Sequence, residues 1–174
     1  IQEWTVPLTT TYTISAYGAG SRALNDGGYG ARITGTCTLT KGEVIQILVG
    51  QQASTGTNRS SHGRAGGTFV VRTPYNTNAS IIVIAGGGGG GHNMGTRTTG
   101  NASLTTSGNV GHSTIAGGTA GGAGSTGAGG NGGAGFFQAP STAVSGGYTA
   151  DSFVTGGIGG EHLNSAGQGG FGGG

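Results

Sequence analysis

The sequence is poor in charge, cysteine, proline and long apolar stretches, and each shortage excludes a class of protein. Lys and Arg number seven among 174 residues, too few for a protein that binds nucleic acid by neutralising phosphates. Three prolines and no strict Gly-X-Y period exclude collagen. The longest apolar run, 81–85, has five residues, whereas a transmembrane helix needs about 20. Cys37 is the only cysteine, so the chain has no internal disulfide framework.

The first half of the chain has the pattern of short β-strands. Tyr12, Ile14 and Ala16 alternate with Thr and Ser, which is the period-two pattern of a strand with one buried face. We expect strands at 4–6, 11–16, 33–39, 43–49, 68–71 and 81–84, separated by turn residues at 25–28, 41–42, 66–67 and 74–78. The apolar segment 43–49 suits a strand covered on both faces. This spacing predicts an all-β sandwich or a barrel-like jelly roll.

Glycine dominates the second half, because residues 1–84 contain 12 of the 45 glycines and residues 85–174 contain 33. Two interpretations are open. Composition alone favours a flexible linker, which buries nothing. Extended glycine helices, the counterpart of polyproline II, could instead pack side by side and pair their backbone groups with their neighbours. Isolated large residues favour packing, because a solvated linker has no use for them: Phe136, Phe137, Tyr148, Phe153, Ile158 and Phe171.

Several stretches follow one another in an order that resembles one known family. They are 1–7 (IQEWTVP), 12–20 (YTISAYGAG), 47–52 (ILVGQQ), 65–70 (AGGTFV) and 81–90 (IIVIAGGGGG). This order resembles the extracellular glycine-rich domain of the anaplastic lymphoma kinase and leukocyte tyrosine kinase receptors. The resemblance covers most of residues 1–90, and the last six residues (GGFGGG) look like a further glycine stretch of that domain.

The resemblance implies a jelly-roll sandwich, similar to the tumour-necrosis-factor fold, with an inserted bundle of polyglycine helices. It therefore favours packed glycine helices over a linker in the second half. Related glycine-rich modules occur in secreted proteins without a kinase, and polyglycine bundles occur in some phage adhesins. The sequence lacks the receptors' disulfide cysteines, and it contains neither a kinase nor a membrane span.

Residue patterns typical of catalysis or cofactor binding are weak. Residues 18–23 (GAGSRA) match a dinucleotide-binding fingerprint, but a turn (LNDGG) follows where that site needs a helix. The four histidines lack metal-ligand spacing: His62, His92, His112 and His162. The carboxylates form no catalytic pair in sequence: Glu3, Asp26, Glu43, Asp151 and Glu161. We therefore expect no enzyme activity, no cofactor and no metal.

Three Asn-X-Ser sequons indicate a secreted, extracellular glycoprotein, with Asn58, Asn78 and Asn101 as the acceptors. Two other features have a functional and an ordinary interpretation. The polar loop around Asn58, with Arg59, His62 and Arg64, could bind an anion or be a solvated loop. The ring of Trp4 could stack on a sugar or a partner, but its place in a strand favours the core.

Cys37 is in phase with apolar residues of the segment 33–39, which favours a small buried hydrophobe over a reactive thiol. Residues 1–84 are predicted to form the β-sandwich core. Residues 85–174 are predicted to form the glycine-rich region with polyglycine II helices, and a strand near 148–154 is predicted to return to the sandwich.

The predicted function is that of a non-enzymatic structural or adhesive module, a subunit of an extracellular filament or matrix. Low charge removes self-repulsion, so self-association costs little, and no nucleic-acid partner is expected. Two alternatives stay open: a receptor ectodomain module that binds a protein ligand, and a phage-type adhesin tip.

Overall fold

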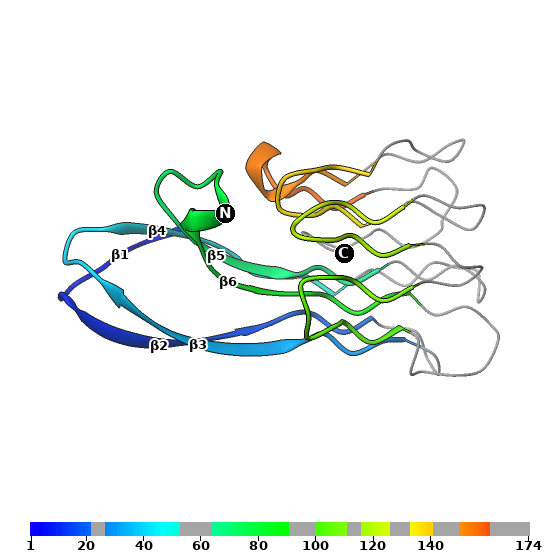
Figure 1. Ribbon diagram of the computed structural model, residues 1–174, viewed down its shortest axis with the longest axis horizontal. Coiled ribbons are helices and arrows are strands. Elements are labelled where there is room, and N and C mark those ends of the chain that lie inside the picture. Colours follow the sequence, from blue (N-terminus) through cyan, green and yellow to red (C-terminus); the bar gives the residue numbers. More distant parts are fainter. Residues whose placement is uncertain are drawn as a thin grey trace.

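The computed structural model describes residues 1–21, 27–52, 64–90, 100–110, 116–125, 133–140 and 150–160. Its strands are β1 (Gln2–Thr5), β2 (Thr10–Tyr17), β3 (Arg32–Leu39), β4 (Val44–Leu48), β5 (Thr68–Arg72) and β6 (Ile81–Ala85) (Figure 1). Two short 3-10 helices are also present, η1 (Asn78–Ser80) and η4 (Phe153–Thr155). The predicted all-β fold class is confirmed, because strands in antiparallel sheets dominate.

The strands form two antiparallel sheets of unequal size. One sheet has the order β1-β4-β5-β6, and the hairpin β2-β3 forms the other. The hairpin packs over β5 and β6, as Figure 1 shows from the side. Each of the six segments expected to be strands overlaps one of these strands. Gly42 adopts a φ of 86° between β3 and β4, a left-handed conformation that glycine accepts without strain.

The first core lies between the hairpin and the four-stranded sheet. The alternating residues of β2 explain it, because Tyr12, Ile14 and Ala16 face the sheet while Thr and Ser face solvent. On the solvent face, hydroxyl pairs join the two strands of the hairpin, as between Ser15 and Thr34 at 2.8 Å. The buried members of this core are Val6, Ala16, Leu39, Ile45, Val70, Val83 and Ala85.

A second core covers the opposite face of the four-stranded sheet. Phe69 of β5 lies beneath two phenylalanines from the glycine-rich half, with ring centroids 6.4 Å from Phe136 and 5.4 Å from Phe153. Leu48 and Val71 complete the buried cluster. Strand β4 thus contributes to both cores, as the apolar segment 43–49 predicted. The large residues at 136 and 153 anchor the glycine-rich half on the sheet.

The strand expected at 148–154 is not present in its described part. Residues 150–152 lie outside any strand and residues 153–155 form η4, while 148 and 149 lie outside the described residues. The chain turns here because Gly156 and Gly157 take φ values of 126° and 69°, and Thr155 hydrogen-bonds back to Ser152. Phe153 nevertheless reaches the sheet as a buried side chain.

Glycine-rich segments leave the strand ends and run side by side away from the sheets (Figure 1). Their backbones are hydrogen-bonded to one another. The segment 86–89 exchanges bonds of 2.6 to 3.1 Å with 18–21, 27–31, 64–67 and 100–102. These bonds cross residue 85, where the composition changes, so both halves of the sequence build one array. Within the described residues, no helix is long and apolar enough to cross a membrane.

Candidate functional site

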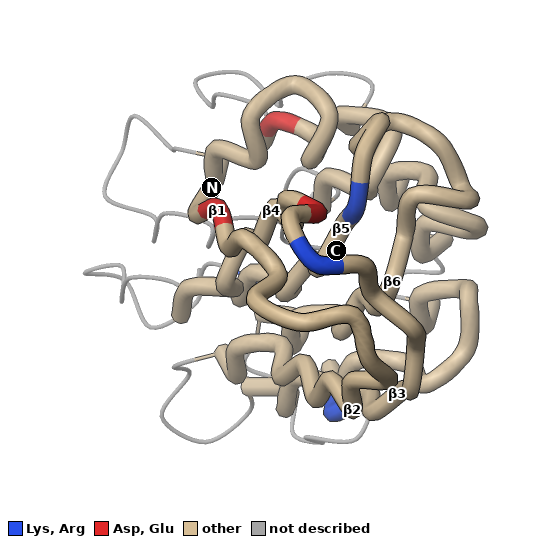
Figure 2. Tube along the Cα trace, turned by 90° about the vertical axis from the view of Figure 1, so that its left-hand side faces the viewer, with Lys and Arg blue, Asp and Glu red and all other residues tan. Residues whose placement is uncertain are grey.

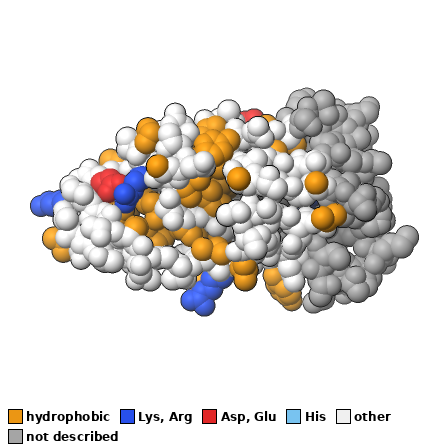
Figure 3. Space-filling view, in the orientation of Figure 1, with side chains coloured by type: hydrophobic (Ala, Val, Ile, Leu, Met, Phe, Trp, Pro, Cys, Tyr) orange, Lys and Arg blue, Asp and Glu red, His pale blue; other side chains and the backbone are white. Residues whose placement is uncertain are grey.

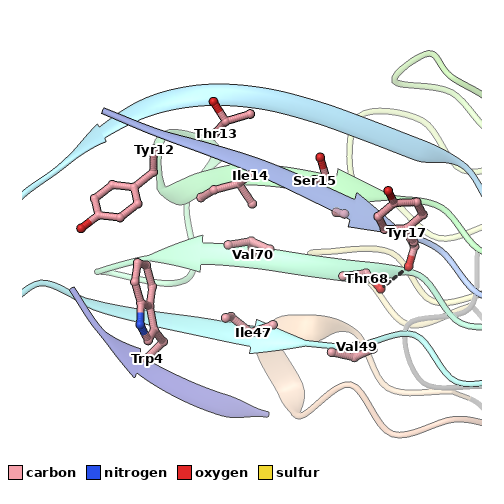
Figure 4. A pocket seen from close by; sticks show the side chains of 11 residues that line it. Trp4, Tyr12, Thr13, Ile14, Ser15, Tyr17, Ile47, Val49, Thr68 and Val70 are labelled. Carbon is pink, nitrogen blue, oxygen red and sulfur yellow. Dashed lines mark hydrogen bonds between the residues drawn. The ribbon is translucent and has the colours of Figure 1, made fainter. Parts of the chain in front are cut away.

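An apolar groove opens between the hairpin and the four-stranded sheet. Its volume is about 500 Å³, within the range of pockets that bind ligands. In the space-filling view, hydrophobic side chains gather in the hollow between the two layers (Figure 3). The lining residues come from β1, β2, β4 with the residue that follows it, and β5: Trp4, Tyr12, Thr13, Ile14, Ser15, Ala16, Tyr17, Ile47, Val49, Thr68 and Val70 (Figure 4).

Two contacts between the sheets mark the two ends of this groove. At one end the rings of Trp4 and Tyr12 meet edge to face, with centroids 5.5 Å apart. At the other end the hydroxyl of Thr68 donates to the carbonyl of Tyr17 at 2.6 Å and accepts from the N–H of Gly50 at 2.9 Å (Figure 4). Both contacts join strands of different sheets, so the two sheets are held together at each end of the groove.

The groove suits apolar binding and does not suit acid–base chemistry. None of its lining residues is Asp, Glu, His, Lys or Arg. Charged residues are sparse along the rest of the described chain, and in Figure 2 most of them lie near β1, β4 and β5 with both signs mixed. A charge buried without a partner is costly, so the walls select an uncharged, apolar occupant.

Two of the carboxylates that were considered for catalysis, Glu43 and Glu3, make contacts between strands or within turns, and Asp151 contributes a backbone hydrogen bond from its N–H to the carbonyl of Ile158. Glu43 lies 3.1 Å from the Nε of Arg72 and accepts from the backbone N–H of Thr40. Glu3 accepts from the amide of Gln46 on the neighbouring strand. Within the described ranges, no three His, Cys, Asp or Glu side chains gather as metal ligands would. Asp26, Glu161 and all four histidines lie outside these ranges: His62, His92, His112 and His162.

The fingerprint-like segment 18–23 has a structural role in its described part. The N–H groups of Gly18, Ala19 and Ser21 donate to carbonyls of neighbouring segments at 2.9 to 3.0 Å, so they do not point at a phosphate. Cys37 is half-buried against the first core, as a small hydrophobe would be.

Burial lowers the pKa of the Arg64 guanidinium, and arginine nevertheless stays charged at neutral pH. Its expected neighbours, Asn58, Arg59 and His62, lie outside the described residues.

Two of the three sequons lie on the described surface in different settings. Asn78 is exposed at the start of η1. Asn101 is half-buried, and its side-chain oxygen accepts from the N–H of Tyr29 at 2.9 Å. Asn58 lies outside the described residues. The acceptor role of all three stays a prediction.

Sequence reasoning identified the strands but missed the groove. It assigned Trp4 to the core, and the half-buried indole does pack on the first core while also lining the groove. Val49, whose side chain is 56 % exposed on the groove wall, was not among the residues that the sequence indicated. Two aromatic residues near the ends of consecutive strands, Trp4 and Tyr12, were the available signal.

A comparison with protein-family models finds no match to this chain.

Proposed function

We propose that this chain is a non-enzymatic structural and adhesive module of the extracellular space. In this proposal, the two sheets are part of a jelly roll similar to the tumour-necrosis-factor fold, and the glycine segments are polyglycine II helices. One observation supports the proposal of polyglycine II helices: the segment 86–89 hydrogen-bonds to four other segments. A strand in a sheet pairs with at most two neighbours, whereas an extended glycine helix bonds to neighbours all around it.

The spacing of these bonds also supports glycine helices with three residues per turn. Ala31 donates to Gly86, and Gly28 donates to Gly89, so consecutive bonds between the two segments are three residues apart on each. A Cβ built on Gly88 would collide with the carbonyl oxygen of Gly28, and one on Gly18 would collide with that of Gly86. Only glycine permits such close approach of two backbones.

A dense hydrogen-bonded array of this kind suits a building block better than an enzyme. It is held by main-chain bonds, and the low charge of the chain opposes self-association only weakly. Backbone groups at the edges of the array can pair with a neighbouring molecule, as an open sheet edge does. Self-association into a filament or matrix is therefore the expected mode of action.

Negative-stain electron microscopy of the natively purified material tests this assembly proposal. Regular filaments or sheets are the expected result. Discrete monomers or dimers, at concentrations where a matrix protein would be assembled, would overturn it. Mass spectrometry of the same material tests the extracellular assignment, because glycans at the sequons require passage through the secretory pathway.

One observation favours a second candidate, a module that binds a protein ligand, as in a receptor ectodomain or an adhesin tip. That observation is the open apolar groove, whose residue Val49 is 56 % exposed. This function predicts discrete particles and saturable binding of one partner. The assembly proposal predicts instead that particle size grows with protein concentration.

A further inference from the structure

The two sheets of the sandwich do not match in width, and this mismatch creates the groove. The hairpin packs over β5 and β6, while the larger sheet continues beyond them to β4 and β1. Trp4 of β1 and Ile47 of β4 therefore line an open space rather than a closed core. The space above these two strands lies beside β2, in the same layer as the hairpin (Figure 4).

Strand β2 presents a free backbone edge to this space. Its eight residues pair with β3 on one side, and among the described residues no strand pairs with its other side. On that side the carbonyl of Tyr17, at the end of β2, already accepts from the Thr68 hydroxyl, so the edge open to a partner lies before Tyr17. A free edge offers a row of N–H and C=O groups that a further strand can satisfy. A small apolar molecule would leave these groups unpaired, so the edge favours an extended peptide as the occupant.

The walls specify the side chains of that peptide. The residues that line the groove are apolar or carry a hydroxyl group, and none is charged. A strand lying beside β2 would direct every second side chain onto Trp4, Ile47 and Val49 and the others to solvent. A charged residue at an inward position would lose its hydration without gaining a partner. Inward residues must therefore be apolar, while outward residues are unrestricted.

We propose that this groove accepts one extended segment of a partner polypeptide, which pairs with the β2 edge and buries alternate apolar side chains. The proposal does not depend on the assembly proposed above, because it concerns the sandwich and not the glycine array. It rests on the second candidate function, the binding of a protein ligand, and names the kind of segment that the groove would take. Its occupant is a protein segment with alternating apolar residues and an unpaired backbone.

The same geometry excludes pairing of β2 with the β2 edge of a second folded copy. The larger sheet extends beneath the groove as β4 and β1. A copy paired antiparallel through its own β2 would bring its own four-stranded sheet into the space that β4 and β1 occupy. A copy paired parallel would turn the Thr and Ser face of its β2 toward the groove, where apolar residues are required. The occupant must therefore be a segment with no sheet packed beneath it, such as a tail or a long loop.

The single tryptophan of the chain lines the groove, so its fluorescence reports occupancy. The probe is a capped, tryptophan-free peptide of eight alternating Val and Thr residues, which matches the length of β2. We expect a saturable blue shift of Trp4 emission when the peptide binds. A peptide of the same composition in the order Val-Val-Thr-Thr is expected to give no saturable shift, because it cannot place all its valines on one face.

Backbone pairing is tested with two N-methylated isomers of the probe, one methylated on the valines and the other on the threonines. In a strand these two sets of N–H groups point to opposite edges. Loss of binding by one isomer and retention by the other is the expected result. Equal binding by both, or equal loss by both, would overturn strand pairing.

The protein variant Val49→Glu tests the location of the site. The side chain is exposed on the groove wall, so the fold should survive while peptide affinity falls by about tenfold or more. Leu104→Glu is the matched control, because Leu104 is 72 % exposed and lies outside the groove. Equal affinities of the two variants would overturn the proposal. So would a blue shift that depends on protein concentration without any peptide, since it would assign the groove to a second copy.

Discussion

The rings of Trp4 and Tyr12 meet edge to face across the two sheets, with their planes inclined by 83° and their centroids 5.5 Å apart. Trp4 lies on β1, an outer strand of the larger sheet, and Tyr12 lies on β2 of the hairpin. The pair thus joins the hairpin to a strand that it does not cover. It closes one end of the groove.

A double-mutant cycle should measure this ring contact. We expect Trp4→Leu and Tyr12→Leu each to destabilise the fold, and their effects to be less than additive by about 0.5–1.5 kcal/mol, the usual coupling of an aromatic pair. Urea unfolding of the four proteins gives the coupling. Tyr12→Phe is the control for the hydrogen bond from the Tyr12 hydroxyl to the carbonyl of Leu8. Strictly additive effects would mean that the ring contact contributes nothing.

Thr68 should matter through its hydroxyl more than through its size. The hydroxyl donates to the carbonyl of Tyr17 and accepts from the N–H of Gly50, and the Thr68 residue is buried. Thr68→Val keeps the shape but leaves the Tyr17 carbonyl and the Gly50 N–H without this partner, so we expect a loss of about 1–3 kcal/mol. Thr68→Ser keeps the hydroxyl and should cost less. Equal losses in chemical denaturation would assign the effect to packing instead.

The strands could be predicted from the sequence because their signal is local. Alternation in 11–16 and the apolar run in 43–49 each reflect the faces of a single strand, and both segments form strands as expected. The prediction of a strand at 148–154 was wrong in its described part because it also relied on a local signal alone. Phe153 is buried through η4 and a turn at Gly156 and Gly157 rather than through strand pairing, and periodicity over so few residues does not distinguish the two.

The groove and the glycine array depend on relationships that no local pattern contains. The groove exists because the hairpin leaves part of the larger sheet uncovered, which is a property of sheet order. The array depends on which backbone groups meet: those of Gly28 with Gly89, and those of Ala19 with Gly88. In a glycine-rich sequence all such pairings are equivalent by composition, so their register could not be predicted.

Phe136 should be essential for attaching the glycine-rich half to the sheet. Its side chain is fully buried, stacks on Phe153 with centroids 5.2 Å apart and meets Phe137 edge to face. Phe136→Ala should lower the free energy of unfolding by about 3–5 kcal/mol, because it leaves a large cavity. Val154→Ala, at a partly exposed position nearby, should cost little. Thermal unfolding of both variants is the measurement, and similar melting temperatures would contradict the role of Phe136.

Asn78 should be the most readily glycosylated of the two described sequon residues. Its side chain is exposed, whereas Asn101 is half-buried and engaged by Tyr29. Expression through a eukaryotic secretory pathway followed by peptide mass spectrometry should find a glycan on Asn78, and Asn78→Gln should remove it. Ser60→Ala serves as the comparison, because it destroys only the sequon of Asn58. Absence of glycan at Asn78 in secreted, folded protein would contradict the glycoprotein assignment at this position.

Gly88→Ala should disrupt the glycine array through one methyl group. The added Cβ would collide with the backbone carbonyl of Gly28, and backbone cannot move aside as a flexible side chain can. We therefore expect a loss of more than about 2 kcal/mol, comparable with overpacking a core. Gly35→Ala is the matched control, because a Cβ on Gly35 meets nothing within 4 Å and the residue lies within β3. There alanine should be neutral or stabilising by up to about 1 kcal/mol, because it lowers the entropy of the unfolded chain. Thermal unfolding followed by circular dichroism compares the two variants. If both melt at the same temperature, the segments of the array are not in close contact and the proposed packing of glycine helices fails with them.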